Sequence, residues 1–195
     1  MERSVCILRP MKIGLYGGSF DPIHHGHLIL AREAREQFAL DRVLFIPAAL
    51  SPHKLDSAPT PGEARREMVA AAIAGEPDFE CEDCDLHREG PSFAIETVRE
   101  LRARWPDARF FYLIGHDNVA KLRTWHCYDK LWRAVQFVVF GRGEHDAPHD
   151  FPTIVRRVDI SATEIRSRVA RGLSIRYLVP EPVRAIIERR RLYKE

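Results

Sequence analysis

The chain has 195 residues, of which 45% are hydrophobic and 30% charged, with a formal net charge of +2. These values are typical of a single folded domain and exclude a disordered or fibrous chain. No apolar run approaches the roughly 20 residues that span a bilayer, and the first ten residues lack the apolar core of a signal peptide, so we expect a cytoplasmic protein. The charge is too small to indicate a nucleic-acid partner by itself.

Short β-rich apolar runs alternate with amphipathic stretches after Met11. Strands are expected at 13–16, 43–47, 78–81, 109–115 and 137–141, with a shorter candidate after Pro152. Helices are expected at 27–38, 63–74 and 93–105, in a broken stretch at 117–135, from Ser161 onward, and at 181–190. This alternation predicts an α/β, Rossmann-like, doubly wound parallel sheet of about five strands, with helices on both faces and a C-terminal helical portion. We expect one domain over 11–195, preceded by an extension of residues 1–10 outside the core.

The segment GGSFDPIHHGH, residues 17–27, directly follows the first expected strand. In open parallel sheets, ligands bind beyond the carboxyl ends of the strands. Gly17 and Gly18 carry no Cβ, so the main chain there can approach a phosphate closely and point its amides at anionic oxygens. Two adjacent glycines alone are weak evidence for such a site.

Two histidines strengthen the case for a phosphate site. His24 and His27 lie three residues apart at the start of an expected helix, so both can face one side, which Gly26 keeps open. Imidazoles at a helix N-terminus can donate hydrogen bonds to a phosphoryl group as negative charge develops on it. The alternatives are plain loop residues or zinc ligands. No HExxH motif accompanies them, and Asp21 more readily caps a turn ahead of Pro22, so we expect no metal at this site.

A second candidate site lies in the run ISATEIRSR, residues 160–168. Ser161 and Glu164 have the spacing of a capping box, which indicates a well-capped helix. Thr163 and Arg166 then lie near a second helix N-terminus, where a triphosphate could be held. Both interpretations can hold together.

Residues 17–27 resemble the GGxFDPxHxGH context of the HxGH nucleotidyltransferase superfamily. Residues 160–166 are similar to its ISSTxIR motif, with Ala162 in place of the second serine. Further segments resemble the bacterial nicotinate-nucleotide adenylyltransferases over nearly the whole chain after Met11. They are SPHK (51–54), GPSFAIETV (90–98), IGHDNVAKLRTWH (114–126) and LVPEPVRAII (178–187).

The resemblance implies transfer of AMP from ATP to nicotinate mononucleotide, giving nicotinate adenine dinucleotide and pyrophosphate in NAD biosynthesis. Together, the residues and the resemblance predict an ATP site made of Gly17, Gly18, Ser19, Phe20, His24, His27, Ile160, Ser161, Thr163 and Arg166. They predict an acceptor site made of Lys54, Ala94, Asp117, Trp125 and His126. The residues expected to act in catalysis are His24, His27, Arg166 and Lys54. Magnesium is expected to travel with ATP rather than to sit in a protein cage.

Three acceptor-site residues also have a physical rationale of their own. Lys54, on a long loop, can follow a phosphate, and Asp117, after a strand end, can accept ribose hydroxyls. Trp125 can stack on a pyridine ring. Each could instead be an ordinary loop lysine, helix cap or packing residue. Phe93-Ala94 replaces the family's usual Tyr-Thr, and His126 replaces a frequent Tyr, which leaves selectivity for the acid over the amide open.

Several alternatives remain. Nicotinamide mononucleotide or pantetheine phosphate could be the acceptor in the same chemistry. The Arg-rich end ERRRLYKE could indicate a nucleic-acid-binding module, although no recognised motif accompanies it. Cys81 and Cys84 with His87 could begin a zinc module, but the set lacks a second CxxC. We expect reduced cysteines and no nucleic-acid or membrane partner, and the sequence permits a homo-oligomer.

Overall fold

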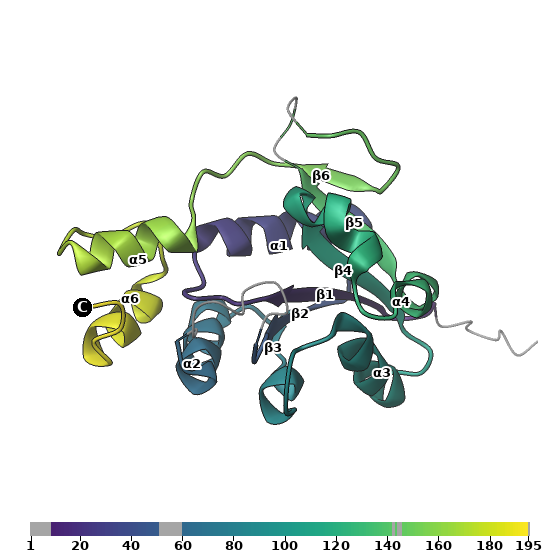
Figure 1. The fold of residues 1–195 in the computed structure, drawn as a ribbon, viewed down its shortest axis with the longest axis horizontal. Helices are drawn as coiled ribbons and strands as arrows, with labels where there is room; N and C mark the ends of the chain where they lie inside the picture. Colours follow the sequence, from purple (N-terminus) through teal and green to yellow (C-terminus); the bar gives the residue numbers. More distant parts are fainter. Residues whose placement is uncertain (1–8, 51–59, 142, 144–145, 195) are drawn as a thin grey trace, which may run out of the picture.

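The computed structural model describes residues 9–50, 60–141, 143 and 146–194. Within them, six parallel strands form one sheet in the order β3-β2-β1-β4-β5-β6 (Figure 1). The strands are β1 (Lys12–Gly18), β2 (Arg42–Pro47), β3 (Phe79–Cys81), β4 (Arg109–Gly115), β5 (Gln136–Gly141) and β6 (Thr153–Val155). This is the predicted doubly wound fold, but with a sixth strand, because the short candidate after Pro152 pairs with β5.

The helices follow the expected alternation. They are α1 (His25–Phe38), α2 (Gly62–Ile73), α3 (Ala94–Arg104), α4 (Tyr128–Ala134), α5 (Ala162–Ala170) and α6 (Glu181–Arg189). Two 3-10 helices, η1 (Cys84–His87) and η2 (His116–Thr124), complete the described elements. No helix in the described ranges is long and apolar enough to cross a bilayer.

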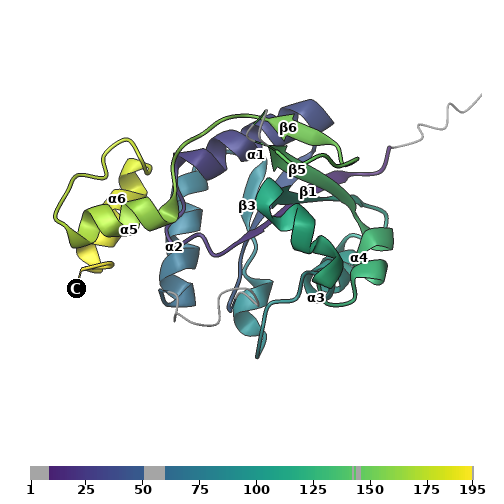
Figure 2. The ribbon, with the colours of Figure 1, turned by 45° about the horizontal axis from the view of Figure 1, so that its top comes forward.

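The strand side chains alternate between two hydrophobic layers, one on each face of the sheet. On one face, Phe45 packs with α1, α2 and α6, and on the other, Leu44 packs with α3 and α4. Helices therefore cover both faces. α5 and α6 lie together at one end of the molecule, with α6 against α2 (Figures 1 and 2).

The broken stretch expected at 117–135 consists of two separate elements. Trp125, His126 and Cys127 separate η2 from α4. Cys127 has a left-handed backbone with φ of 53°, which interrupts helical geometry directly before α4. The interruption leaves Trp125 and His126 on an irregular segment near the end of β4.

A crevice opens between β1 and β4, where the strand order reverses. The two strands pair only as far as Leu15 and Tyr112. Beyond that point Gly17 and Gly18 pair with β2 alone, while the end of β4 pairs with β5. The two glycines thus end β1 instead of following it as expected. Diverging strand ends at a topological switch point form the usual ligand crevice of such sheets.

Candidate functional site

Two cavities occupy this end of the sheet. The first has a volume of about 640 Å³ and lies between the end of β1, the start of α3 and the Trp125 segment. The second, of about 900 Å³, lies between the start of α1, the end of β5 and the start of α5. Tyr16, Gly115 and Asp117 line both. The cavities are therefore neighbours that share a wall.

The two histidines of the HHGH motif form a stacked pair on the wall of the second cavity. Their ring centroids are 3.7 Å apart, and the backbone N–H of His24 donates to Nδ1 of His27 at 3.2 Å. His24 is the N-cap of α1, with an extended backbone, so its side chain lies beside the backbone amides at the start of the helix. The predicted common orientation of the pair is confirmed.

His24 is 6% exposed, and Nδ1 of its ring has no hydrogen-bond partner within the described residues. Burial, followed by the nearby His25, lowers the pKa of His24 to about 4. Gly26 makes room for the ring, since a Cβ there would lie 3.0 Å from its Cε1 and Nδ1. His24 is thus a neutral imidazole at pH 7. Its ring packs so closely on Gly26 that a side chain there would lie nearer than an ordinary van der Waals contact.

Residues 19–22, here called the first turn, join β1 to the histidines. Arg166 donates from Nη1 to the carbonyl oxygen of Asp21 at 2.8 Å, although 145 residues separate the two. The carboxylate of Asp21 was expected to cap a turn ahead of Pro22. Instead, it accepts hydrogen bonds from the backbone N–H of Thr60 and the hydroxyl of Tyr193. Three distant segments thus hold one residue of the first turn.

Phe20, which was predicted for the ATP site, has a buried side chain. Its side chain is 2% exposed and lines neither cavity. The ring lies beneath Gly18 and packs edge-on against Tyr16 and His27, with centroids 5.5 and 5.1 Å away. The large apolar ring is thus buried as support for the histidine pair, and the assignment of Phe20 to the ATP site stays a prediction.

The start of α5 borders the second cavity as expected. The hydroxyl of Ser161 accepts from the backbone N–H of Glu164 at 3.1 Å, which confirms the predicted N-cap. Arg166 also donates from Nη2 to the hydroxyl of Thr163 at 3.3 Å. The cavity lining includes Ile160, Ser161, Thr163 and Arg166 together with His24 and His27. Two motifs more than 130 residues apart in the sequence therefore meet.

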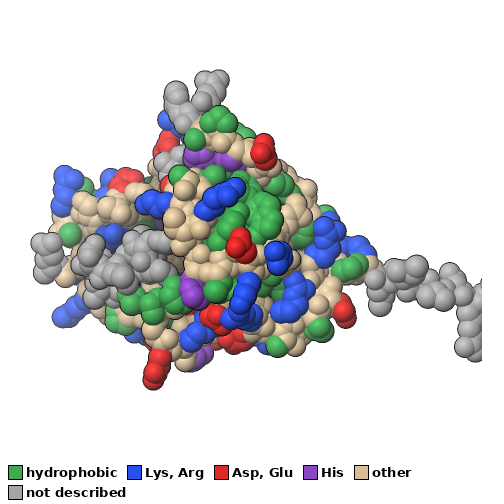
Figure 3. All heavy atoms as spheres, turned by 45° about the vertical axis from the view of Figure 1, so that its right-hand side comes forward, with side chains coloured by type: hydrophobic (Ala, Val, Ile, Leu, Met, Phe, Trp, Pro, Cys, Tyr) green, Lys and Arg blue, Asp and Glu red, His purple; other side chains and the backbone are tan. Residues whose placement is uncertain are grey.

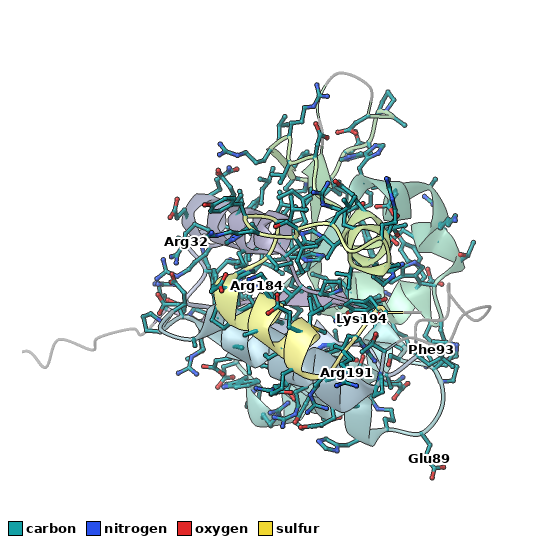
Figure 4. The ribbon with its side chains drawn as sticks, turned by 90° about the vertical axis from the view of Figure 1, so that its left-hand side faces the viewer. Arg32, Glu89, Phe93, Arg184, Arg191 and Lys194 are labelled. Atoms are coloured by element: carbon teal, nitrogen blue, oxygen red, sulfur yellow. The ribbon has the colours of Figure 1, made fainter. Side chains whose placement is uncertain are left out.

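The predicted acceptor residues Ala94, Asp117, Trp125 and His126 line the first cavity. Gly17, Gly18 and Ser19, which were predicted for the ATP site, line this first cavity and not the second. The rings of Phe93 and His126 lie 4.5 Å apart, and Trp125 packs edge-on against Tyr112. Phe93 precedes α3, and Glu89, on the same loop, projects away from the body of the protein (Figure 4). Lys54 and the SPHK segment lie outside the described residues.

Asp117 occupies the shared wall of the two cavities. It follows the end of β4 on η2, and its side chain is exposed. The nearby Asp117 charge also adds to the effect of burial in raising the pKa of Tyr16, whose phenol therefore stays protonated. A carboxylate at this position can reach a ligand in either cavity.

Sequence reasoning missed two buried charged residues of this region. Arg65, on α2, is 1% exposed and donates hydrogen bonds around the first turn. Asp85, on η1, lines the first cavity and accepts from the hydroxyl of Thr97 at 2.5 Å and from Arg88 at 3.0 Å. Neither belongs to a motif. Their partners come from distant segments, which a single sequence does not reveal.

The zinc alternative finds little support in the geometry. Cys81 ends β3, whereas Cys84 lies on η1, and burial raises the pKa of both thiols, that of Cys81 to about 11. Within the described ranges, no three His, Cys, Asp or Glu side chains are grouped so that they could hold a metal ion.

The strand order, the crevice at the switch point and its two adjoining cavities define a doubly wound α/β protein with room for two ligands end to end. The chain belongs to the cytidylyltransferase-like family, whose sequence profile matches residues 15–168.

Individual relatives cover nearly the whole chain. A protein of Exiguobacterium sibiricum named "Probable nicotinate-nucleotide adenylyltransferase" is 45% identical over 192 residues, 94% of this chain and 99% of that protein. A protein of the same name from Thermus thermophilus is 43% identical over 94% of this chain and 100% of its own length. The solved structure of Plasmodium falciparum nicotinic acid mononucleotide adenylyltransferase complexed with NaAD has a TM-score of 0.77 and 18% identity, covering 94% and 97% of the two chains. That last similarity concerns the fold.

Proposed function

We propose that this chain transfers the adenylyl group of ATP to nicotinate mononucleotide, releasing pyrophosphate and forming nicotinate adenine dinucleotide for NAD biosynthesis. The observation that carries the proposal is the pair of adjoining cavities with the stacked His24 and His27 beside their shared wall. Two nucleotides held end to end there would bring their phosphates together. The names of the full-length relatives support the same reaction.

The second cavity is proposed to hold ATP. The start of α5 presents the positive end of a helix and the hydroxyl of Thr163, groups suited to the triphosphate. Arg166 adds a fixed positive charge, and its bond to the Asp21 carbonyl orients it toward the first turn. His24 and His27 are proposed to contact the α-phosphate.

The first cavity is proposed to hold the mononucleotide. Trp125 would stack on the pyridine ring, while backbone amides near Ala94 and His126 would receive its carboxylate. Asp117, on the shared wall, would accept ribose hydroxyls. Lys54 remains the predicted partner of the incoming phosphate.

The reaction requires one bond to form and one to break. A phosphate oxygen of the acceptor attacks the α-phosphorus of ATP, and the bond from that phosphorus to the β-phosphate oxygen breaks, so pyrophosphate leaves with the electron pair. The second pKa of a phosphate monoester is about 6, so the nucleophile is already anionic at neutral pH and needs no general base. Catalysis can therefore rest on positioning and on stabilising charge.

The chain's own residues would supply both. The neutral imidazole of His24, together with the ring of His27, can donate N–H groups to oxygens of the α-phosphate as negative charge grows there. Arg166 would hold the departing pyrophosphate. Magnesium is proposed to arrive on the ATP phosphates, where it would neutralise charge, because Mg²⁺ usually keeps several waters and few protein ligands.

A nucleic-acid-binding role for the C-terminal arginines has a specific observation against it. Arg189 and Arg190 both pair with Glu67 on α2, and Arg184 pairs with Glu181 and Glu188 on its own helix. These arginines therefore balance acidic side chains of the same molecule. The cytoplasmic location and the oligomeric state remain predictions.

A pyrophosphate-release assay tests the proposed function. The purified protein would be supplied with ATP and, in turn, nicotinate mononucleotide, nicotinamide mononucleotide and pantetheine phosphate. We expect the highest kcat/KM with nicotinate mononucleotide. A higher value with another acceptor would transfer the proposal to that substrate, and no release with any acceptor would refute adenylyl transfer.

A further inference from the structure

We infer that Arg65 is a positioning residue for the first turn, which it holds to α2 and to the end of β2. The inference rests on the proposed adenylyl transfer, for which the first turn joins the glycines of β1 to the histidine pair. Arg65 touches neither cavity and would act through the main chain of the turn.

The guanidinium of Arg65 is buried and binds only backbone carbonyls among its described partners. Nη1 donates to the carbonyl of Ser19 at 2.8 Å and to that of Ala48 at 2.7 Å. Nε donates to Thr60 at 2.8 Å, and Nη2 to Ala49 at 3.3 Å. One side chain thus joins the first turn, the end of β2 and the residues before α2. A planar fork of five donors can do this, whereas the single ammonium of a lysine cannot.

Fixing the Ser19 carbonyl has a direct consequence for the site. In a trans peptide, the carbonyl and the following N–H point in opposite directions, so the bond to Arg65 sets the orientation of the Ser19–Phe20 peptide. Ser19 lines the first cavity, and Ala48 lines it as well. Arg65 therefore sets the placement of two neighbouring pieces of the same wall.

The same wall is held from its other side. The hydroxyl of Ser92 accepts from the N–H of Ala49 at 2.9 Å, and the N–H of Ser92 donates to Leu50. The end of β2 is therefore fixed between Arg65 and the segment before α3. Loss of Arg65 would leave four partly buried carbonyls without this donor, and the wall would be held from one side only.

Arg65 also places a positive charge behind the first turn. All four of its hydrogen bonds go to neutral carbonyls, and Asp21, the carboxylate that acts on it electrostatically, is already bound by Thr60 and Tyr193. A buried cation at a turn that receives phosphates stabilises negative charge there without reorganising during the reaction. Arg65 would thus contribute both geometry and charge.

The chain offers a matched control in Arg102. That arginine, on α3, likewise donates to backbone carbonyls, those of Pro106, Ala108 and Ala134. These residues precede β4 and β5, at the opposite end of the sheet from the cavities. Replacing Arg102 therefore removes a similar set of bonds without touching the first turn.

The test compares Arg65→Met, Arg65→Lys and Arg102→Met by thermal unfolding, by the kcat and KM for ATP and acceptor, and by calorimetric binding of ATP alone. We expect Arg65→Met to lower kcat by about 10–100-fold, since small misplacements in a site cost on this order. Arg65→Lys should recover part of the loss because it keeps the charge. Arg102→Met should lose stability while its folded molecules keep the kcat and ATP affinity of the parent.

Unchanged kcat and ATP affinity in folded Arg65→Met would overturn the inference, because the arginine would then be structural only. If Arg65→Met does not fold, the folded Arg65→Lys decides in its place: a parental kcat and ATP affinity would overturn the inference, and a loss in either would support it. If the unmodified chain releases no pyrophosphate, the proposed function fails. ATP binding by the variants then still shows whether Arg65 organises a nucleotide site.

Discussion

The hydroxyl of Tyr193 donates a hydrogen bond to Oδ1 of Asp21 across 2.6 Å, although 172 residues separate them. Burial, followed by the charge of Asp21, raises the pKa of Tyr193, so the phenol keeps the proton that it donates. The end of the chain is thereby joined to the first turn, and the carboxylate of Asp21 is held from two directions.

Tyr193→Phe should lower the free energy of unfolding by about 1–2 kcal/mol, because a partly buried carboxylate loses a hydrogen-bond donor. Denaturant unfolding measures the difference. Tyr177→Phe is the matched control, since Tyr177 is 78% exposed, and its stability should equal that of the parent. Equal stabilities for all three proteins would show that the Tyr193 bond contributes nothing.

His24→Ala should lower kcat by about 10²–10³-fold, the cost of removing one donor to transition-state charge. His25→Ala removes the neighbouring imidazole, which does not line the second cavity, and should keep most of the activity. Circular dichroism would verify that both variants fold. Near-normal pyrophosphate release from folded His24→Ala would refute the proposed role of the histidine.

Gly26→Ala should reduce kcat while leaving the stability nearly unchanged. Alanine favours a helix, but its Cβ would lie 3.0 Å from the ring of His24 and displace it. A double-mutant cycle isolates this cause, because Gly26→Ala should have little further effect once His24 is already alanine and only the Cγ1 of Val158, 3.3 Å from the added Cβ, remains close. If both backgrounds lose the same factor, the glycine acts by some route other than His24.

Lower pH should destabilise the protein through His24. Its folded pKa of about 4 lies below the ordinary value of about 6.5, so both states are neutral at pH 7 and only the unfolded state gains a proton between pH 6.5 and 4. The free energy of unfolding should therefore fall across that range, by on the order of 2–3 kcal/mol from this residue. Carboxylates titrate in this range too, so the free energy of unfolding is measured against pH for the parent and for His24→Asn. The variant's curve should be flatter. Parallel curves would contradict a depressed pKa.

Trp125→Ala should raise the KM for the acceptor about tenfold or more, since loss of an aromatic stacking partner costs on the order of 1–2 kcal/mol. The KM for ATP should change little, because Trp125 lines the first cavity alone. Trp132→Ala provides the control: that tryptophan is 50% exposed and lines neither cavity. A rise in the KM for ATP instead would reverse the proposed assignment of the cavities.

Hydrophobic patterning predicted most of the sheet, because buried parallel strands leave continuous apolar runs such as 109–115. The nucleotidyltransferase-like motifs predicted that residues 24–27 and 160–166 belong to one site, and the fold brings them together. β6 was only a short candidate. Its three residues follow an irregular segment, and pairing with β5 makes them a strand.

Other features were beyond the sequence because they depend on packing between distant segments. In the sequence, Arg65 looks like an ordinary charged residue on the surface of an amphipathic helix. Its hydrogen-bond acceptors are backbone carbonyls, which any residue type carries, so no sequence pattern reveals them. Phe20 lies inside a motif, and the motif does not reveal that its apolar ring is buried. The grouping of side chains on the surface also depends on packing between distant segments. Figure 3 shows hydrophobic side chains gathered at the centre of one face, with Lys and Arg side chains around them.

The shared wall formed by Tyr16, Gly115 and Asp117 has a consequence for turnover. Under the proposed reaction, the two substrates enter separate cavities, but the product is one molecule that occupies both. The two halves of the dinucleotide are covalently linked, so when one half is bound in its cavity the other is at a high effective concentration near the second cavity. The dinucleotide should therefore bind more tightly than either mononucleotide. We therefore expect the product to leave more slowly than either half alone would, and accumulated dinucleotide to compete with both substrates at once.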